Sequence, residues 1–342
     1  ALNCNHDEQA AFISTSRGCP AACHFCASPR FWGRSVRARS VASVVDEMLY
    51  LQQQYGLLHI SLRDDTFTAD RERTIALCQE LLRRDARLFW SCQSRAEAID
   101  RETVSWMRRA GCECIQLGVE SGSEPILKLL NKKSSAALVI QAGNIIKESG
   151  LALSIYLISA IPEETDQDKQ LTKRLVLTLA PDDIQIAPLA YYPGTALFQR
   201  DVTRGIIREE IFEERTEQAL LVMDESGLSQ HRAMVSSTMP LTKAPDSQQL
   251  DVVIKRDGYH AVLAMRAGDA ASQEGNRKKA LAYYRQICDH EPTHPWGWLL
   301  MAEQAEAEGK YDMAKEAWQR LLTLVPAHQP AIQALQELTR MP

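Results

Sequence analysis

The hydrophobic pattern divides the first 190 residues of the chain into short apolar runs that alternate with longer amphipathic runs. The short runs have the character of strands, and they lie at 11–16, 57–62, 87–92, 113–119, 152–158 and 184–189. The longer runs carry apolar residues at i, i+3 and i+4, which predicts helices, and they lie at 41–55, 70–84, 100–110, 123–130, 135–149 and 166–180. Strands that alternate with helices predict a parallel sheet, and six such units fit an open, partial (β/α)6 barrel.

Polar residues directly follow most of the predicted strands. In a parallel barrel the C-terminal ends of the strands meet at one rim, where reactive groups gather. A cysteine-rich loop follows the first strand, and the residues that follow later strands are Asp64 and Asp65, Arg95, Glu120 and Ser121, and Tyr191. The pattern therefore predicts that these residues share one rim.

The C-terminal part of the chain is helical in pattern and repeats itself. Similar residues recur 34 positions apart, as in the pairs Gly275 and Gly309, Ala280 and Ala314, Tyr284 and Trp318, and Pro292 and Pro326. This period is typical of the tetratricopeptide repeat, a helix–turn–helix unit. Residues 259–342 are predicted to form two such repeats and a capping helix. The repeats would either bury barrel surface or bind a protein partner, and the sequence leaves both open.

The remaining segments carry weaker signals. Residues 201–258 are charged over 208–225 and polar after that, which predicts a helix that covers the barrel, followed by a linker. Residues 1–10 form a predicted tail without the basic and apolar segments of a signal peptide. Ala1 fits either removal of a methionine or truncation of a longer chain. No run is long and apolar enough to predict a membrane span.

Composition is that of an ordinary soluble protein of two domains, because 45% of the 342 residues are hydrophobic and 24% are charged. A formal net charge of −5 gives no reason to expect nucleic acid or an acidic membrane as a partner. Nine cysteines at uneven spacing do not fit a secreted disulfide framework. We therefore expect a reducing, cytoplasmic location.

Three of the cysteines, Cys19, Cys23 and Cys26, lie in one short loop at C-x3-C-x2-C spacing. Their thiolates can hold three irons of a 4Fe–4S cluster, whereas an electron-transfer ferredoxin supplies four cysteines. The fourth iron would remain open to a small molecule. A structural zinc ion is the alternative, and it needs a fourth ligand, which Cys4, His6 or His24 could supply.

The cysteine loop resembles the cluster motif of the radical S-adenosylmethionine (radical SAM) enzymes. The resemblance covers about residues 11–200, and it is strongest to members that carry a cobalamin-binding domain before the radical domain; the segments that carry it are 14–20, 33–40, 63–67, 118–123 and 192–195. In that family S-adenosylmethionine chelates the open iron, and an electron cleaves it to a 5′-deoxyadenosyl radical that abstracts a substrate hydrogen. An electron donor such as flavodoxin or ferredoxin is implied, as is cobalamin held by a domain outside this chain.

The resemblance also implies cofactor contacts near the cysteines. Phe25 would pack near the adenine or shield the cluster from water. Asp64 and Asp65 stand where many members have a Gly-Gly-Glu run that meets the amino group of the cofactor. The alternative for Asp65 is that, with Thr66, it caps the turn into the following helix.

Further along the rim, Glu120 ends an apolar strand, where a buried carboxylate needs a partner. A ribose hydroxyl or the methionyl ammonium would serve, with Ser121 and Tyr191 nearby, and a salt bridge to Arg95 is the alternative. Arg95 itself would bind the methionyl carboxylate in the bidentate manner that arginine favours.

One segment departs from the family. Where members usually show Gly-x-Pro-Gly-Glu-Thr, this chain has Ala160 and Glu163 in place of the glycines. Glycine would permit positive φ or close approach of the backbone. A catalytically degenerate protein that keeps its cluster, with the repeats as an interaction module, is therefore the second hypothesis.

The segment 30–39 interleaves four arginines with aromatic residues just after the cysteine loop. Such a run can bind single-stranded nucleic acid, but the acidic net charge favours arginines that hold loop carboxylates or an anionic substrate or cofactor. The remaining cysteines considered, Cys78, Cys92, Cys112, Cys114 and Cys288, are predicted to be core residues.

The resemblance therefore implies a radical SAM enzyme that acts on an unactivated carbon of a small molecule or peptide. Methyl transfer is the leading reaction if a cobalamin domain is present, and ring closure or rearrangement is the alternative. The identity of the substrate does not follow from these residues.

Overall fold

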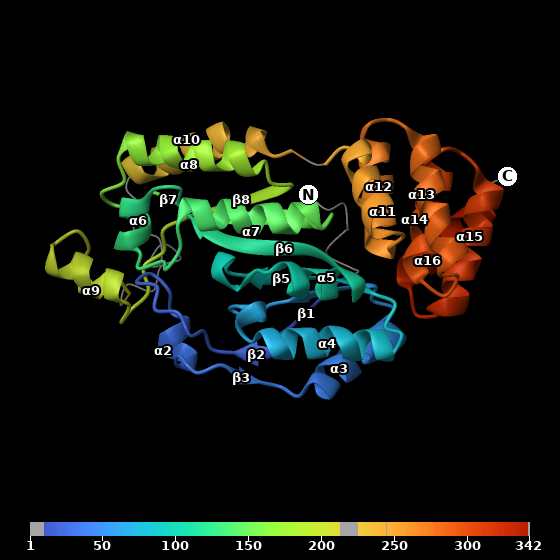
Figure 1. Cartoon of the computed structure of the whole chain (residues 1–342), viewed down its shortest axis with the longest axis horizontal. Coiled ribbons are helices and arrows are strands. Elements are labelled where there is room, and N and C mark those ends of the chain that lie inside the picture. The colour runs from blue at the N-terminus through green and yellow to red at the C-terminus, as the bar shows by residue number, and fades with distance from the viewer. Residues whose placement is uncertain (1–9, 213–224, 244, 341–342) are drawn as a thin grey trace.

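The computed structural model describes residues 10–212, 225–243 and 245–340 (Figure 1). Cys4 and His6, considered above as zinc ligands, lie outside the described residues, as does most of the helix predicted at 208–225.

Six parallel strands form the sheet that organises the N-terminal part of the molecule. In spatial order they are β1 (Ala10–Ile13), β4 (His59–Leu62), β5 (Phe89–Ser94), β6 (Cys112–Glu120), β7 (Ala152–Ser159) and β8 (Asp183–Pro188). Every neighbouring pair is parallel. Because β1 and β8 each have one neighbour in this sheet, the barrel is open, and the predicted partial barrel is confirmed.

Helices cover the outer face of the sheet and connect its strands. They are α3 (Val41–Tyr55), α4 (Arg71–Arg83), α5 (Arg101–Arg109), α6 (Glu124–Leu129), α7 (Ala136–Glu148) and α8 (Asp166–Leu179). All six were predicted, and most begin where a polar side chain accepts a hydrogen bond from the first helical turn, namely at Ser40, Asp70, Asp100, Ser135 and Thr165. Each such cap stabilises its helix by about 1 kcal/mol. Short 3-10 turns precede α4 and α5, at η1 (Phe67–Ala69) and η2 (Ala96–Ala98).

A small ribbon that the pattern did not predict carries the cysteine loop. The two-residue strands β2 (Ser16–Arg17) and β3 (Arg37–Ala38) pair antiparallel, and helix α2 (Ser28–Trp32) lies between them in the chain. Gly18 turns the chain out of β2 with a φ of 99°, and an added Cβ there would lie 2.4 Å from the Ser35 carbonyl oxygen. Only glycine therefore fits directly before Cys19.

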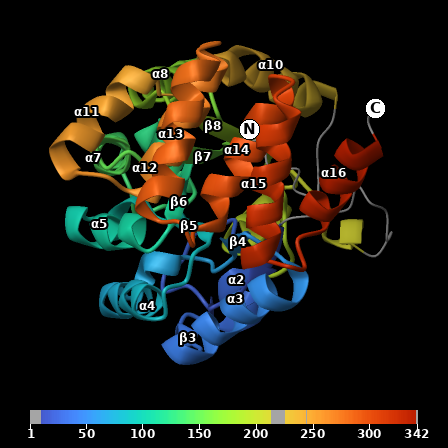
Figure 2. The same ribbon diagram turned by 90° about the vertical axis from the view of Figure 1, so that its right-hand side faces the viewer.

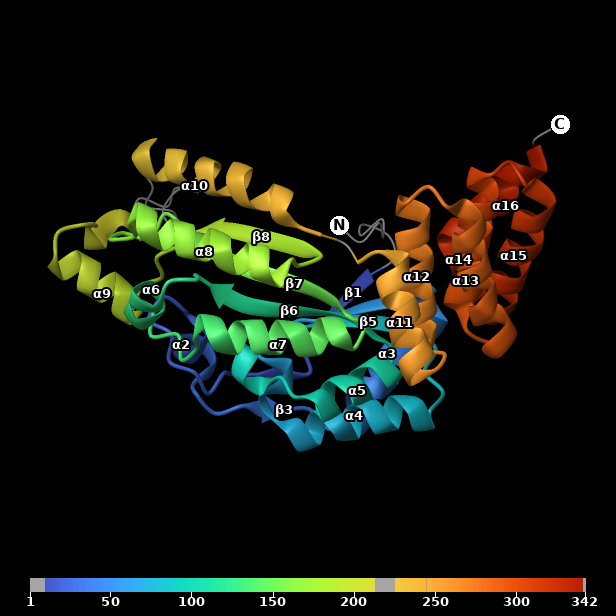
Figure 3. The same ribbon diagram turned by 45° about the horizontal axis from the view of Figure 1, so that its top comes forward.

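After β8 the chain forms α9 (Ala196–Thr203), η3 (Glu209–Phe212), α10 (Glu225–Thr238), η5 (Met239–Leu241) and α11 (Ser247–Asp257). The predicted linker is therefore wrong over most of its length, because α10 and α11 occupy it. Figure 3 shows α10 running along α8 and β8. Few of its side chains are buried, Met234 and Thr238 among them, so its sequence is polar and lacks a helical hydrophobic period.

The C-terminal helices repeat at the predicted period. They are α12 (Ala261–Gln273), α13 (Arg277–His290), α14 (Pro295–Ala307), α15 (Tyr311–Leu324) and α16 (Gln329–Arg340). Helices α12, α14 and α16 start 34 residues apart, and so do α13 and α15. The helical C-terminal region is confirmed, while its assignment to the tetratricopeptide family stays a prediction.

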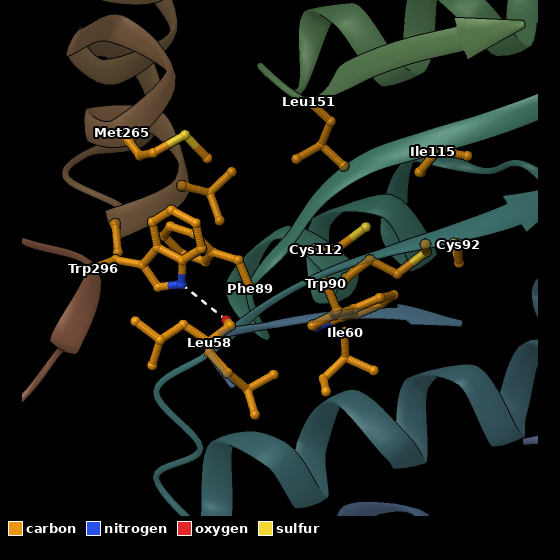
Figure 4. Close-up of a cluster of buried hydrophobic side chains, with 14 of the residues drawn as sticks. Leu58, Ile60, Phe89, Trp90, Cys92, Cys112, Ile115, Leu151, Met265 and Trp296 are labelled. Carbon is orange, nitrogen blue, oxygen red and sulfur yellow. Dashed lines mark hydrogen bonds between the residues drawn. The ribbon is translucent and has the colours of Figure 1, made fainter. Parts of the chain in front are cut away.

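These helices close the N-terminal end of the barrel (Figures 1 and 2). The indole Nε1 of Trp296 donates to the carbonyl of Leu58, at 2.9 Å, and its ring stacks on Phe89 with centroids 5.0 Å apart (Figure 4). Both contacts lie where β4 and β5 begin. Two ion pairs of 2.7 Å lie at this end, one between Arg266 of α12 and Asp182, and one between Arg108 of α5 and Asp257 of α11.

Within the described residues, no helix combines the length and the apolar character that crossing a bilayer requires.

Candidate active site

The cysteine loop lies at the C-terminal rim of the barrel, between β2 and α2. Cys19 is buried, and its Sγ lies 3.6 Å from Thr66 Oγ1, while Cys23 and Cys26 are half-buried. Burial raises the pKa of the Cys26 thiol, and the nearby Cys23, Asp65 and Cys19 raise it further. The three thiols are thus close enough to influence one another but reach the solvent differently.

Helix α6 and the residues after it hold this loop in place. The backbone N–H of His24 donates to Leu130, at 2.9 Å, and Nδ1 of the same residue bonds the carbonyl of Leu129, also at 2.9 Å. The side chain of Asn131 donates to the carbonyl of Ala22, at 2.6 Å. One ring nitrogen of His24 is therefore committed to the backbone, which weakens its case as a zinc ligand.

Arg95, at the end of β5, contacts the cysteine loop directly. Its Nη1 donates to Cys23 Sγ, at 3.3 Å, and its Nε is paired with Glu97. Burial lowers the pKa of this guanidinium, but the charges of Cys23 and Glu97 more than offset burial, and the pKa rises above its ordinary value. In the described part of the chain its Nη2 is buried without a hydrogen-bond partner.

A cavity of about 500 Å³ opens beside Arg95 and the cysteine loop. Its lining includes Pro20, Thr66, Glu97 and Lys133. A buried arginine with a free N–H at the wall of such a cavity can bind an anion, since an unpaired buried donor is costly.

The two aspartates after β4 have different roles. Asp64 is fully buried and accepts four hydrogen bonds, from the backbone N–H and the hydroxyl of Thr15, at 2.6 and 2.5 Å, and from those of Ser16, at 3.1 and 2.7 Å. The structure therefore gives Asp64 the role of joining β4 to the chain between β1 and β2. Asp65 accepts one bond from Ser28 at the start of α2, at 2.6 Å. The expected helix cap is made by Asp70, not by Asp65.

Glu120 forms an ion pair with Lys132, which the sequence did not predict. Its Oε1 accepts from Lys132 Nζ at 2.8 Å, and both side chains are almost buried. The expected alternative, a salt bridge to Arg95, is wrong. An added Cβ at Gly118 would lie 2.9 Å from both charged atoms, so the strand needs glycine there to admit the pair. Glu120 itself has a φ of 67°, which a non-glycine residue adopts only at a cost.

Ser121 and Tyr191 are not among the residues that line this cavity. Ser121 is fully buried, with its Oγ 3.2 Å from Thr172 Oγ1 on α8. Tyr191 donates to the buried Asp201, at 2.5 Å, and burial followed by this bond raises the pKa of the phenol. It packs in a second hydrophobic cluster under α9, against which Phe25 also packs. Phe25 and Tyr191 thus support the cysteine loop from one side.

The segment that lacks the family's glycines keeps a backbone shape suited to glycine. Ala160 has a φ of 56° and Glu163 a φ of 77°. The carboxylate of Glu163 is turned to Arg204 and to Arg200, 3.5 Å away, on and after α9. Each positive φ costs about 1–2 kcal/mol in a non-glycine residue, so the local shape is maintained against intrinsic preference.

The inner face of the sheet carries a polar chain that the sequence did not reveal. Tyr156 donates to Gln116 Oε1, at 3.0 Å, and Gln93 Nε2 lies 3.4 Å from the same hydroxyl. These side chains come from β7, β6 and β5, and all are only half-buried. The signal in the sequence was a polar side chain within each largely apolar strand. By contrast, the five cysteines predicted as core residues are all buried, as expected.

Among the described residues, no three His, Cys, Asp or Glu side chains converge closely enough to hold a single metal ion. A 4Fe–4S cluster places each thiolate on a different iron, so it needs three separated sulfurs on one loop rather than convergence. Three cysteines beside an arginine with an unpartnered N–H fit that group.

Comparison with known proteins gives the same class. Residues 13–176 match the model of the Radical SAM superfamily. An uncharacterized methyltransferase of Pyrococcus horikoshii is 31% identical over 196 residues, which cover 57% of this chain and 42% of the relative. An anaerobic magnesium-protoporphyrin IX monomethyl ester cyclase of Rubrivivax gelatinosus is 29% identical over 195 residues, which cover 56% of this chain and 35% of the relative. The chain thus spans less than half the length of both relatives.

Among solved structures, the radical S-adenosylmethionine methyltransferase TsrM from Kitasatospora setae, with cobalamin and a 4Fe–4S cluster bound, has the same fold. The TM-score is 0.53 at 20% identity, over 57% of this chain and 37% of that chain. Residues 13–176 are thus similar to the radical SAM superfamily, and the chain shares the fold of a radical SAM methyltransferase, as the cysteine loop predicted.

Proposed function

We propose that this protein reductively cleaves S-adenosylmethionine at a 4Fe–4S cluster held by Cys19, Cys23 and Cys26, and thereby starts radical chemistry on an unactivated substrate carbon. The observation that carries the proposal is the position of the cysteine loop at the C-terminal rim, with Arg95 donating to Cys23 at 3.3 Å. When bound, the cluster supplies the electron that breaks the sulfonium bond, and S-adenosylmethionine supplies the radical.

The protein's own residues would orient these groups. Arg95 fixes the sulfur of Cys23 through Nη1, and its unpartnered Nη2 suits the carboxylate of the methionyl group, because arginine binds carboxylates through parallel N–H groups. Glu120 is fixed by Lys132 through Oε1, and Oε2 could accept a bond from a ribose hydroxyl. Asp65 is the member of the aspartate pair with fewer internal bonds, so it is the better candidate for the cofactor's ammonium group.

The second hypothesis, a catalytically degenerate protein that keeps its cluster, was based on the absence of the family's two glycines. Ala160 and Glu163 adopt positive φ without glycine, and Glu163 points to arginines of the α9 region instead of standing unpaired. These features support a segment that still has the shape used to approach a cofactor. We therefore favour the enzyme.

Methyl transfer to the activated carbon is the leading reaction within this proposal, with cobalamin bound by a further domain as the methyl carrier. A methyltransferase and a cyclase among the relatives support methyl transfer and ring closure, respectively. The half-buried amide and phenol groups of Gln93, Gln116 and Tyr156 offer hydrogen bonds to a small-molecule or peptide substrate.

The test is anaerobic reconstitution with iron and sulfide, followed by electron paramagnetic resonance of the reduced protein with and without S-adenosylmethionine. We expect a 4Fe–4S signal that changes when the cofactor is added, and formation of 5′-deoxyadenosine. A cluster signal that ignores the cofactor, with no product, would support the degenerate alternative. Absence of any cluster would return zinc to consideration.

A further inference from the structure

The five arginines closest to the cysteine loop in sequence form the basic end of an acidic molecule. Residues 10–45 contain Arg17, Arg30, Arg34, Arg37 and Arg39, and no Asp or Glu. With a net charge of −5 for the whole chain and +5 for this segment, the remainder carries −10. The charge of the protein is therefore strongly separated along the chain.

Most of these arginines have no carboxylate partner in the part of the chain that the structure describes. Arg39 is paired with Glu47, but for Arg17, Arg30, Arg34 and Arg37 no Asp or Glu lies within ion-pair distance in the described residues, and all four are exposed. Among the described residues, only Arg39 therefore shows the expected bond to a carboxylate, and for the other four arginines the second expectation, an anionic substrate or cofactor, stays a prediction. Their charge is available to a partner.

Apolar side chains are exposed among these arginines. Phe31 is 78% exposed, and Trp32 and Val36 are 38% and 36% exposed. The guanidinium of Arg17 lies over the Trp32 ring, 4.9 Å from its centroid, which holds that ring in place. Aromatic residues with arginine are the composition that distinguishes protein interfaces from other surface.

This patch, defined by Arg17, Arg30, Phe31, Trp32, Arg34, Val36 and Arg37, adjoins the cysteines. Helix α2 begins two residues after Cys26, and Arg30 lines a cavity of about 250 Å³ together with Cys23 and Cys26. The chain between Cys26 and Phe31 spans at most about 18 Å. The patch lies at the end of the molecule opposite the C-terminal helices (Figure 1).

We propose that the patch is the docking surface for an acidic one-electron carrier protein, which delivers to the site the electron that the proposed function requires. The inference rests on that function, since only a reductive reaction needs such a partner. Reduced carrier would be oxidised by one electron, and the oxidised 4Fe–4S cluster would gain it, with no atom transferred. Positive charge beside the cysteines would steer the acidic partner to the side from which the electron must enter.

Single-stranded nucleic acid is the other anionic partner that an arginine and aromatic surface could bind. The observations favour the carrier, because the patch adjoins the cavity lined by Cys23 and Cys26 instead of extending over a long groove. The charge of −10 on the remainder of the chain would also repel an extended polyanion beyond the patch.

The experiment compares Arg30→Glu, Phe31→Ser and their double variant with Arg285→Glu, a matched charge reversal on α13 of an exposed arginine. Arg30 has no side-chain hydrogen bond in the described part of the chain, so its replacement leaves the loop contacts intact. The probe is bacterial flavodoxin. Its dissociation constant from the reconstituted protein is measured by calorimetry, and the rate of cluster bleaching by its reduced form by stopped-flow absorbance.

We expect the double variant to weaken flavodoxin binding and to slow bleaching by about tenfold or more, with a reduced dependence on salt, and Arg285→Glu to change neither. The final extent of bleaching by excess dithionite should be equal in all variants, because a small reductant needs no docking surface to reach the cluster. Unchanged flavodoxin affinity and rate in the double variant would overturn the proposal. The proposal would also be overturned if the unmodified protein bound a single-stranded RNA 20-mer but not flavodoxin, and if the same variants lost the RNA binding.

Failure of the proposed function is distinguishable from these outcomes. It would show as the absence of 5′-deoxyadenosine when dithionite is the reductant, whatever the affinity for flavodoxin.

Discussion

The two ends of the barrel are formed by the same six strands, but they are built in opposite ways. At the C-terminal rim the cysteines are partly open, Arg95 keeps an unpartnered buried N–H, and a cavity adjoins both. Of the six non-glycine residues with positive φ in the described chain, Glu120, Ala160 and Glu163 belong to this rim.

At the N-terminal end, the C-terminal helices cover the strand starts with large side chains. Trp296, Phe89 and Leu58 are packed and hydrogen-bonded there, and ion pairs join the two surfaces. Buried side-chain atoms without a hydrogen-bond partner in the described residues occur at both ends, Arg95 at the rim and Arg108 and Arg266 at the N-terminal end. Backbone with positive φ thus gathers where chemistry is proposed, and large packed side chains gather at the other end. This is the division expected of a molecule whose site is maintained by stability generated elsewhere.

The packing at the N-terminal end of the barrel also indicates what the C-terminal repeats do. Residues of α12 and α14 and of the turn before α16 face the barrel, so this surface serves packing, one of the two roles that the sequence left open. Binding of a protein partner on their other surfaces remains a prediction.

The largest contrast between the ends should come from cysteine replacement. Cys23→Ala should abolish cluster binding and 5′-deoxyadenosine formation, while the melting temperature of the apoprotein falls little, because Cys23 is only half-buried. Cluster absorbance and product chromatography are the measurements. Cys288→Ala on α13 is the control and should keep both signals; loss of the cluster in the control alone would contradict the assignment.

Trp296→Ala tests the opposite end. Removing a buried indole should lower the free energy of unfolding by about 3–5 kcal/mol, measured by urea denaturation of the apoprotein. Trp298→Ala is the matched control on the same helix; its indole bonds only the carbonyl of Pro292 and is more exposed, so we expect a loss of about 1 kcal/mol. Equal losses would show that Trp296 does not anchor the barrel.

Acid should weaken the same end. Burial lowers the pKa of His294 to about 3 and that of His260 to about 4, whereas both titrate near 6.5 when unfolded. The unfolded chain therefore binds more protons below pH 6.5, and stability falls as the pH falls. Between pH 6.5 and 5 each histidine should contribute a loss of about 2 kcal/mol. Asp269, whose pKa burial raises to about 6, acts in the opposite direction.

The His294→Gln variant measures the contribution of His294 to this pH dependence of stability. Its free energy of unfolding, measured by urea at pH 7 and pH 5, should depend less steeply on pH than that of the unmodified protein. A pH dependence that does not change would contradict a neutral buried His294.

The smallest effect should come from a pair of alanines with positive φ, one at each end. Ala160→Gly at the rim and Ala180→Gly after α8 should each raise the free energy of unfolding by up to about 1 kcal/mol, because glycine adopts φ values of 56° and 43° without strain. Only Ala160→Gly should alter S-adenosylmethionine affinity, measured by calorimetry on the reconstituted protein. If Ala160→Gly and Ala180→Gly changed the affinity for S-adenosylmethionine equally, the rim position would have no special role in binding the cofactor.

The sequence predicted the elements that depend on local periodicity and turn chemistry. All six strands and the helices between them are present, and the residues after the strands do face one end of the sheet. Arg95 was expected on the same rim as the cysteine loop, because parallel strands end on one side of a barrel, and it does contact Cys23 there.

The partners of these residues could not be predicted in the same way. Asp64 is saturated by Thr15 and Ser16 because a two-residue ribbon, too short to show a period, brings them to it. Lys132 reaches Glu120 from a turn after α6, where a lysine would ordinarily be exposed. Helix α10 was missed because few of its side chains are buried, whereas α11 carries Leu250, Val253 and Ile254 at helical spacing but directly follows the polar run that predicted a linker.

The closure of the N-terminal end has a consequence for biosynthesis. Leu58 and Gly56 receive their hydrogen bonds from Trp296 and His328, which lie 238 and 272 residues later in the chain. At about 5–20 residues per second, a ribosome needs roughly 12 to 50 s to produce those partners. Until Trp296 and His328 have been synthesised, the apolar side chains at the starts of the strands remain uncovered. This protein should therefore depend on chaperones during synthesis.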